Sequence, residues 1–419
     1  MINEQKIRKQ VKQPKQVIIK KIIRKIRKRK TRLIILIMLP ILATLFAFTF
    51  IISNVNAINA DNQSFNTINT INTNNPINNF INDSIDDFIN GSVSNLINNS
   101  INTTEIAGNL NNTNVTSKEQ LIIESLQKDA GEIKIYFCKY NDCLNSLLGI
   151  INSSHSLKCA FYDLDITPLI EIIEEKDSFL VLEDKLQEDE LIIGMNAEKY
   201  FVEKSSYMHH KFCVLDDKYL LTGSMNPTYN GVNKNNNNFF YIESKILAKN
   251  YINEIEHLAK GVEYNQTNIF ALNDFVIENY FLPEHSKIVV ERIISLINIS
   301  NSTIDIAAFS FTSEEIFNAI LETHLRGVKV RVLLEKRYMN AESSKYKILN
   351  ELGIEVRFDN NPYSMHHKFI IIDSNVLETG SMNYSENAKT NNENIFIIYN
   401  NKIATAFMQE FDRLWSISS

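Results

Sequence analysis

The chain of 419 residues has an ordinary globular composition, with 44% hydrophobic and 22% charged residues, and is long enough for two to three domains. Its net charge of -6 conceals a division, because residues 1–32 hold fourteen of the 43 basic residues and one of the 49 acidic residues. The remaining 29 basic and 48 acidic residues give the rest of the chain a net charge of about -19, which argues against nonspecific binding of DNA or RNA.

The first two segments indicate contact with a membrane. Residues 6–32 are basic with isoleucines at helical spacing, which predicts an amphipathic helix on an anionic membrane surface; a solvated charge run is an equal alternative. Residues 33–52 are uncharged and long enough to cross a bilayer core. We predict an uncleaved single-pass transmembrane helix, with the basic segment (1–32) in the cytoplasm and the catalytic domain extracellular. A cleaved secretory signal is the alternative, because small residues at 55–57 resemble a cleavage site.

Residues 53–117 form a low-complexity, Asn-rich segment, which we interpret as a disordered linker. It contains seven N-x-S/T sequons that would accept glycans outside the cell, although an Asn-rich composition also produces sequons by chance. These sequons begin at Asn62, Asn82, Asn90, Asn98, Asn102, Asn111 and Asn114.

Strands alternate with helices after the linker, which predicts an α/β fold. In a first half, residues 118–262, we expect strands at 132–137, 157–162 and 179–183, and helices at 141–151, 168–175 and 245–258. In a second half, residues 263–419, we expect strands at 303–309, 328–334, 355–358 and 394–399, and helices at 287–297, 313–325, 341–352 and 403–415. The two halves therefore repeat one plan of about 150 residues.

One segment occurs in both halves at the same spacing. Residues 208–216 and 365–373 each read M-H-H-K-F followed by three apolar residues and Asp, and both close with T-G-S-M-N at 222–226 and 379–383. Each copy is apolar and rich in β-branched or aromatic residues, which predicts a strand. Agreement at so many polar positions is not expected from two unrelated strands that each contain a buried histidine.

The residue types in this segment suit a phosphate substrate. Side chains two apart on a strand share a face, so His209 points the same way as Lys211, and His366 the same way as Lys368. The second histidine of each copy points to the opposite face. An ammonium group binds an anion while an imidazole attacks it or transfers a proton. Two such strands brought together would place two imidazoles and two ammonium groups in one site.

These segments resemble the H-x-K-x4-D and G-S-x-N motifs of the phospholipase D superfamily, and the resemblance covers about residues 118–419 with both motifs complete. It implies a phospholipase D-like fold in which two pseudo-repeated α/β/α halves form one catalytic unit, here preceded by the transmembrane helix and the linker. The superfamily includes phospholipases, cardiolipin synthases, nucleases and other phosphodiesterases.

The resemblance also implies roles for individual residues. In similar members, an acidic or amide residue after the second motif hydrogen-bonds the histidine of the opposite half, so Glu393 would orient His209 and Asn237 would orient His366. A carboxylate makes its histidine the better nucleophile, so we expect His209 to attack phosphorus and His366 to protonate the leaving alcohol.

The candidate site follows from these assignments. The candidate catalytic residues are His209, Lys211, Asp216, His366, Lys368, Asp373 and Glu393. The candidate substrate-binding residues are Ser224, Asn226, Ser381, Asn383 and Asn237. The two aspartates fall on the other strand parity, so a structural or orienting role comes before a chemical one. We expect neither a metal nor a cofactor, because adjacent histidines on a strand point apart.

All four cysteines lie in the first half, where an extracellular location would permit disulfides. A bridge between Cys138 and Cys143 and a bridge to Cys159 are both open alternatives. Cys213 shares the strand parity of His209, so we expect it in the core beneath the site.

The sequence predicts an enzyme that hydrolyses a phosphodiester, most plausibly of a phospholipid head group, through a phosphohistidine. The membrane anchor favours a phospholipid, and we expect a monomeric catalytic unit. A membrane-anchored nuclease acting on nucleic acid is one alternative. A cardiolipin synthase-like transphosphatidylase is a second, which the single transmembrane helix disfavours. A catalytically dead binding module is a third, which the two intact motifs disfavour.

Overall fold

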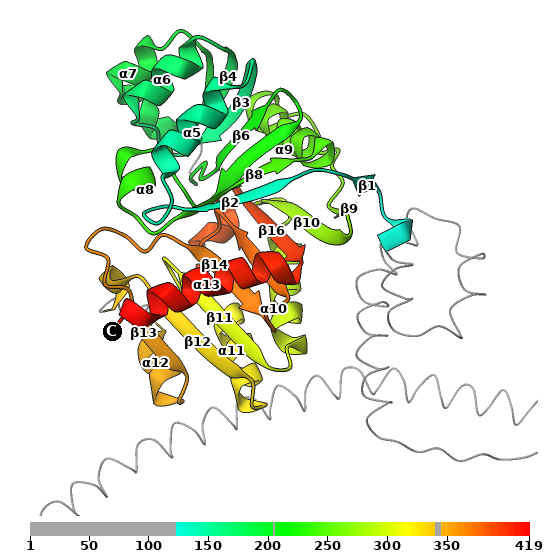
Figure 1. Cartoon of the computed structure of the whole chain (residues 1–419), viewed down its shortest axis with the longest axis vertical. Coiled ribbons are helices and arrows are strands. Elements are labelled where there is room, and N and C mark those ends of the chain that lie inside the picture. The colour runs from blue at the N-terminus through cyan, green and yellow to red at the C-terminus, as the bar shows by residue number, and fades with distance from the viewer. Residues whose placement is uncertain (1–122, 204–205, 340–344) are drawn as a thin grey trace, which may run out of the picture. The chain divides into compact units, whose positions relative to one another are not determined.

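The computed structural model describes residues 123–419 except 204–205 and 340–344 (Figure 1). The predicted amphipathic helix, transmembrane helix and Asn-rich linker lie outside these residues. Within the described part of the chain, no helix is both long enough and apolar enough to cross a membrane.

A seven-stranded mixed sheet forms the first part of the fold, with strand order β2-β8-β7-β6-β3-β4-β5. Its strands are β2 (Ile133–Phe137), β3 (Ser156–Phe161), β4 (Asp177–Glu183), β5 (Glu198–Val202), β6 (Lys211–Leu215), β7 (Tyr219–Gly223) and β8 (Asn238–Glu243). The accompanying helices are α5 (Cys143–Asn152), α6 (Thr167–Glu174), α7 (Glu190–Gly194), α8 (Tyr229–Asn233) and α9 (Lys245–Lys260), with a 3-10 turn η3 (Asp184–Glu188).

A nine-stranded mixed sheet forms the second part, with strand order β1-β9-β10-β16-β15-β14-β11-β12-β13. Its strands are β1 (Lys128–Asp129), β9 (Ile269–Leu272), β10 (Phe275–Leu282), β11 (Thr303–Ala308), β12 (Lys329–Leu334), β13 (Glu355–Phe358), β14 (Lys368–Ile372), β15 (Val376–Gly380) and β16 (Glu393–Tyr399). The helices are α10 (Ser286–Ile299), α11 (Glu314–Leu325), α12 (Tyr346–Glu351) and α13 (Asn401–Ile417), with 3-10 turns η4 (Lys336–Tyr338) and η5 (Asn387–Thr390).

The two sheets repeat one topology. Strands β3, β4 and β5 are parallel neighbours, as are β11, β12 and β13. Strands β6 and β14, which continue the motif segments, pair antiparallel with β3 and β11. The short strand β1 lies early in the chain yet pairs with β9, so the nine-stranded sheet contains residues from both predicted halves. The predicted boundary near residue 262 stays a prediction.

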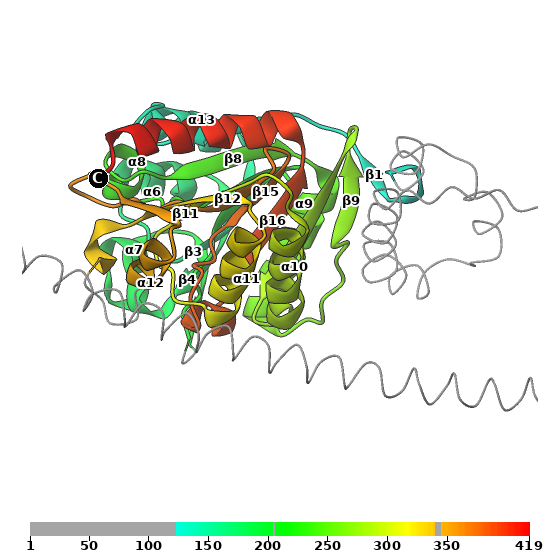
Figure 2. The same cartoon turned by 90° about the horizontal axis from the view of Figure 1, so that it is seen from below.

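The core is layered because successive strand residues face opposite sides of a sheet. Phe212 and Phe369 belong to a central cluster with helices α9 and α13. Their neighbours Cys213 and Ile370 belong to two outer clusters, one with α5 and α6 and one with α10 and α11. Figure 2 shows α10 and α11 lying side by side, in agreement with their many shared contacts. Each motif strand is therefore buried on both faces, as its continuous apolar run requires.

Most predicted elements are present with bounds shifted by a few residues. Ser313, the first residue of the helix expected at 313–325, caps α11, because its hydroxyl accepts from the Ile316 N–H. The helix expected at 341–352 is shorter, since α12 covers only Tyr346–Glu351 and residues 341–344 lie outside the described part. Seven strands of the described residues were not predicted: β1, β5, β7, β8, β9, β10 and β15.

Candidate active site

The segments that carry the motif histidines pair with loops of the other half of the chain. The His209 N–H donates to the Asn392 carbonyl at 2.9 Å, and the His366 N–H donates to the Asn236 carbonyl at 2.8 Å. Isolated parallel bridges accompany both hydrogen bonds. Because each segment is fixed by the opposite half, the two motifs are held together at the junction of the two sheets.

His209 is held by the carboxylate of Glu393. Its Nδ1 lies 2.9 and 2.8 Å from the two carboxylate oxygens. The Ser381 hydroxyl donates to the same carboxylate at 2.6 Å, and the Asn391 amide donates at 3.2 Å. Because Nδ1 donates its proton to a fixed carboxylate, Nε2 is left with its lone pair.

His366 is held by neutral acceptors. Its Nδ1 lies 2.9 Å from the Asn237 Oδ1 and 3.0 Å from the Ser224 carbonyl oxygen. A backbone carbonyl can only accept a hydrogen bond, so Nδ1 carries the proton and Nε2 does not. The structure thus contains the two contacts inferred from motif position, one through a carboxylate and one through an amide.

The hydroxyl groups of the two motif serines are engaged in hydrogen bonds within the protein. The Ser381 hydroxyl is occupied by Glu393, and the Ser224 hydroxyl donates to the Asn237 Oδ1 at 3.1 Å. Both serines are fully buried, as is Asn237. These contacts place the three side chains behind the two histidines, and their expected contact with substrate stays a prediction.

Asn226 and Asn383 differ from the serines in having uncommitted side chains. Among the described residues, neither Oδ1 atom has a hydrogen-bond partner, although both are buried. Buried amides without partners are uncommon in folded proteins. The Nδ2 groups of both residues also have no hydrogen-bond partner among the described residues, and these N–H groups are the donors that a phosphate oxygen would need.

The glycine before each motif serine permits close contact between neighbouring strands. A Cβ atom on Gly223 would lie 2.3 Å from the Asn238 carbonyl oxygen, and one on Gly380 would lie 2.1 Å from the Asn394 carbonyl oxygen. Both distances are too short for any side chain. The glycines thus let β7 and β15 approach the strands that follow the histidine-orienting residues.

The two motif lysines are almost completely buried. Lys211 Nζ donates to the His209 carbonyl oxygen at 2.6 Å, and Lys368 Nζ donates to the His366 carbonyl oxygen at 2.8 Å. Burial lowers the pKa of Lys211 to about 7, with the Glu393 charge opposing the change, and burial likewise lowers the pKa of Lys368. Each ammonium group retains only one hydrogen bond within the described residues, which suits it to bind an anion.

The electrostatics show that both histidines and both lysines share one region. Burial lowers the pKa of His209, and the charges of Lys211 and Lys368 lower it further. Burial and the same two lysines also lower the pKa of His366. Both imidazoles are therefore neutral before a substrate enters. Burial raises the pKa of Glu393 to about 7, while the Lys211 ammonium favours its ionised form.

The second histidine of each motif points away from this region. His210 Nε2 lies 2.7 Å from Glu254 on α9, and His367 Nε2 lies 3.3 Å from Glu410 on α13. Both imidazoles are fully buried. The alternation predicted from strand parity is confirmed, although β6 and β14 begin only at the motif lysines.

The motif aspartates lie outside the site. Asp216 accepts from the His155 and Ser156 N–H groups, both at 2.9 Å, and Asp373 accepts from three N–H groups of residues 301–303. Burial opposes their ionisation, but these donors outweigh it and lower the pKa of each aspartate. Each aspartate follows its motif histidine by seven residues of largely extended chain, which corresponds to roughly 23 Å. These contacts fit the structural role that was put first for both aspartates, and a catalytic role for them stays a prediction.

Two glutamates that sequence reasoning missed hold the motif segments. Glu183 accepts from the Met208 N–H at 2.6 Å, and Glu335 accepts from the Met365 N–H at 2.7 Å. Each follows the last leucine of an equivalent parallel strand, β4 or β12. The recurrence of Leu-Glu at this point of both halves was the available signal.

An aromatic ring that was also missed packs against each catalytic histidine. Tyr162 contacts His209 edge-on at a centroid distance of 4.7 Å, and Phe309 contacts His366 in the same way at 4.8 Å. Both follow equivalent strands, β3 and β11. Burial raises the pKa of Tyr162 to about 12, so its hydroxyl stays protonated.

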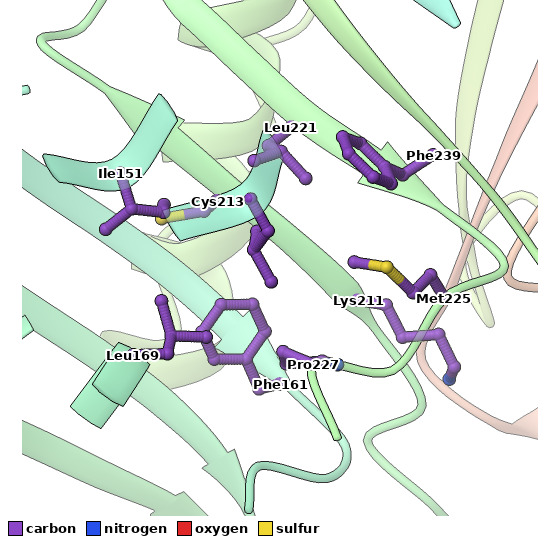
Figure 3. Close-up of a pocket in the computed structure, with 10 residues that line it drawn as sticks. Ile151, Phe161, Leu169, Lys211, Cys213, Leu221, Met225, Pro227 and Phe239 are labelled. Atoms are coloured by element: carbon purple, nitrogen blue, oxygen red, sulfur yellow. The ribbon is translucent and has the colours of Figure 1, made fainter. Parts of the chain in front are cut away.

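A small apolar cavity lies beneath Lys211, and Cys213 lies in its wall as predicted (Figure 3). Cys138 is bonded to Cys143, one of the two open alternatives, and Cys159 is bonded to Cys213. The latter pairing was not anticipated; it arises because the two residues are register partners on β3 and β6. The remaining lining residues are Leu147, Ile151, Phe161, Leu169, Leu221, Met225, Pro227 and Phe239.

A family model described as "Cardiolipin synthase, PLD-like domain" matches residues 170–259 and 293–415, which is about half of the chain and includes both motifs. The chain belongs to the phospholipase D superfamily. The predicted resemblance is thereby confirmed, and the two mixed sheets described above are its phospholipase D-like α/β fold.

Named relatives support this membership. Over 132 residues the chain is 36% identical to human mitochondrial cardiolipin hydrolase, covering 31% of this chain and 52% of that protein. Over 174 residues it is 30% identical to phospholipase D of Rickettsia prowazekii (strain Madrid E), covering 41% of this chain and 83% of that protein. The chain thus spans about half the length of the cardiolipin hydrolase. The enzyme class is confirmed to the extent that these family members are hydrolases.

A solved structure supports the fold alone. Phosphatidylserine synthase of Haemophilus influenzae Rd KW20 aligns with a TM-score of 0.55 and 12% sequence identity. The alignment covers 73% of this chain and 92% of that chain. At this identity the likeness concerns the arrangement of strands and helices and does not extend to the reaction.

Proposed function

We propose that this chain is a phospholipase D-type phosphodiesterase that hydrolyses the head-group phosphodiester of a phospholipid through a phosphohistidine on His209. The observation that carries the proposal is the paired arrangement of His209 and His366. Each imidazole donates through Nδ1 to a residue of the other half and keeps Nε2 unprotonated beside two buried lysines.

In the first step, His209 Nε2 attacks phosphorus. The new P–N bond replaces the P–O bond to the head-group alcohol, and His366 gives a proton to the departing oxygen. The positive charge that develops on His209 is stabilised by the Glu393 carboxylate at 2.8 Å. The amide of Asn237 offers no such charge to His366, which is why we assign the nucleophile to His209.

Binding of the substrate phosphate engages the lysines and amides of the site and changes the protonation state of His366. Lys211, Lys368 and the amides of Asn226 and Asn383 would hold its oxygens and stabilise the charge of the transition state. A bound anion also raises the pKa of His366, which burial and the lysines lower in its absence, so His366 Nε2 takes up a proton from solvent as the substrate binds and then gives it to the departing oxygen. In the second step, His366 takes a proton from water, whose oxygen attacks phosphorus and breaks the P–N bond. An alcohol in place of water would give transphosphatidylation.

The choice of a phospholipid rests on two observations. The chain after residue 32 carries a net charge of about -19, which disfavours a polyanionic nucleic acid. The relatives are named for cardiolipin and phospholipid hydrolysis. One chain supplies both motifs, so we propose a monomeric catalytic unit. We further propose that residues 33–52 anchor it to a membrane on the side where two disulfides persist.

Trapping the covalent intermediate tests the proposal. With bis(p-nitrophenyl) phosphate, whose leaving group needs no acid, His366→Ala is expected to accumulate a phosphorylated His209, because hydrolysis of the intermediate lacks its base. His209→Ala is expected to form no adduct. Mass spectrometry of the peptides under alkaline conditions, where phosphohistidine survives, locates the label.

The exposed His155 provides a matched control, since His155→Ala is expected to turn over the substrate like the unsubstituted protein. Label on His366 in the His209→Ala variant would reverse the assignment. Cleavage of single-stranded DNA in preference to phosphatidylcholine, phosphatidylglycerol and cardiolipin vesicles would replace the phospholipase by a nuclease.

A further inference from the structure

Each half places an exposed cation just outside its catalytic histidine. Lys185 follows Glu183 by two residues, and Arg337 follows Glu335 by two residues, in the turns η3 and η4. The side chains of Lys185 and Arg337 are 43% and 59% exposed. Because this part of the chain is strongly acidic overall, cations at the same repeat position on both sides of the site call for a specific explanation.

The two cations reach the histidines through one aromatic ring each. Lys185 Nζ lies 3.8 Å from the centre of the Tyr162 ring, which contacts His209. Arg337 Cζ lies 5.5 Å from the centre of the Phe309 ring, which contacts His366. On one side of the site the order is therefore Lys185, Tyr162, His209. On the other side it is His366, Phe309, Arg337.

The proposed reaction makes these two ends unequal. In an in-line displacement at phosphorus, the attacking and departing atoms lie on opposite sides. With His209 as nucleophile and His366 as acid, the departing alcohol lies on the His366 side. Arg337 and Phe309 are thus next to the leaving group, together with Tyr338, whose ring contacts Phe309 edge-on at 5.3 Å.

The guanidinium of Arg337 retains donors for a ligand. Its Nε donates to the buried Glu335 carboxylate at 2.9 Å, and its Nη2 donates to the Ser364 hydroxyl. The other three N–H groups have no partner among the described residues. The Glu335 contact fixes the planar group from behind, which suits the remaining donors to a phosphate or carboxylate.

We propose that Arg337, Phe309 and Tyr338 form a leaving-group subsite that selects phosphodiesters whose departing alcohol carries an anion, a second phosphate above all. This inference rests on the proposed function and narrows its substrate. Cardiolipin fits, because the alcohol released from it carries the second phosphate. Phosphatidylcholine fits poorly, because its departing alcohol carries a positive charge.

Lys185 provides the matched control. It occupies the equivalent position on the nucleophile side, where no leaving group is expected, and its ammonium lies 3.4 Å from Asp163. Lys329 is a second control, because it is exposed at the opposite end of strand β12 from Arg337. All three substitutions to Gln remove one positive charge, so they have the same effect on general attraction to an anionic vesicle.

The experiment measures kcat/KM of the full chain for cardiolipin and for phosphatidylcholine, in mixed vesicles of equal anionic charge. Arg337→Gln is expected to lower the cardiolipin to phosphatidylcholine ratio by about 10-fold or more, since a hydrogen bond to a charged group is lost. Lys185→Gln and Lys329→Gln are expected to leave the ratio within about twofold. Arg337→Lys keeps the charge without the planar fork, and is expected to fall between.

Turnover of bis(p-nitrophenyl) phosphate separates the possible failures. If the unsubstituted protein cleaves neither this compound nor any lipid, the proposed function is wrong. If it is active, but the ratio is unchanged in Arg337→Gln or falls equally in Lys185→Gln, the leaving-group subsite is wrong. If Arg337→Gln loses activity on the small diester as well, the Arg337→Lys variant decides. A cardiolipin to phosphatidylcholine ratio in Arg337→Lys equal to that of the unsubstituted protein refutes the guanidinium contact.

Discussion

The two halves hold their catalytic histidines with different chemistry on the same geometry. His209 donates to the Glu393 carboxylate at 2.8 Å, whereas His366 donates to the Asn237 amide oxygen at 2.9 Å. Position, burial and the adjoining lysine are alike in both. The repeat therefore fixes where the imidazoles lie, and in the proposed mechanism the single change of acceptor divides their roles.

The halves also differ in how their sheets are stabilised. Cys159–Cys213 joins strands β3 and β6 of the seven-stranded sheet, and Cys138–Cys143 joins the residue after β2 to the start of α5. Around the nine-stranded sheet lie ion pairs that are largely buried: Arg292 on α10 is 2.6 Å from Glu278 on β10, and Arg331 on β12 is 2.7 Å from Asp305 on β11. A disulfide acts by restricting the unfolded chain, whereas a buried ion pair acts only when both partners are present. The two sheets should therefore respond to different perturbations.

The largest expected effect comes from removing the charge behind His209. Glu393→Gln is expected to lower kcat by roughly 10²–10⁴-fold, because an amide neither fixes the tautomer nor stabilises the imidazolium. Asn237→Ala is expected to cost less, about 10–100-fold, because the Ser224 carbonyl still accepts from His366. Rapid-quench kinetics on bis(p-nitrophenyl) phosphate checks the difference, with Glu393→Gln slowing formation of the phosphohistidine.

Single-turnover rates make this comparison sharper. An equal loss in both variants would show that the two histidines are not divided in role by their acceptors. Glu378→Gln is a suitable control, because Glu378 is also a buried glutamate of the nine-stranded sheet, and Tyr384 is the one side chain that hydrogen-bonds its carboxylate within the described part of the chain.

The next effect concerns the disulfides. The Cys159–Cys213 bond closes a loop of 54 residues and should contribute about 4 kcal/mol to the free energy of unfolding. The Cys138–Cys143 bond has a sequence separation of 5 and should contribute about 2 kcal/mol. Thermal unfolding of Cys159→Ala/Cys213→Ala and Cys138→Ala/Cys143→Ala double variants measures each. A thiol titration of the native protein that finds four reactive or denaturant-exposed free thiols would contradict both bridges.

Much of the site was predictable because the chain contains the motif twice. Strand parity placed His209 and His366 on one face and His210 and His367 on the other, since alternation follows directly from strand geometry. The contact between Glu393 and His209 was implied by the family resemblance, through the position of Glu393 after the second motif. These inferences needed no knowledge of which strands are neighbours.

The features of the site that the sequence did not predict depend on the register between strands and on which residues are neighbours in the folded chain. The Cys159–Cys213 bond requires the exact alignment of β3 and β6, which hydrophobic pattern alone leaves open. The roles of the motif serines depended on which acceptors lie within reach of their hydroxyls. Glu183 and Glu335 are different, because their repeated place after a strand was readable but appeared to be ordinary surface charge.

The smallest expected effect is a shift in the pH dependence of kcat/KM, and it distinguishes Lys185 from Arg337. Burial lowers the pKa of Lys211 to about 7, and Lys185 contributes to this lowering. The ammonium form binds phosphate and predominates below that pKa, so kcat/KM, which reports the free enzyme, should fall by about tenfold per pH unit above pH 7. Lys185→Gln removes a nearby positive charge and should move this alkaline limb to higher pH. Arg337→Gln should leave the limb in place, because Arg337 lies against Phe309 on the His366 side of the site. A limb that moves equally in both variants would mean that the two ends of the site are electrostatically equivalent, and the division of roles would then rest on Glu393 alone.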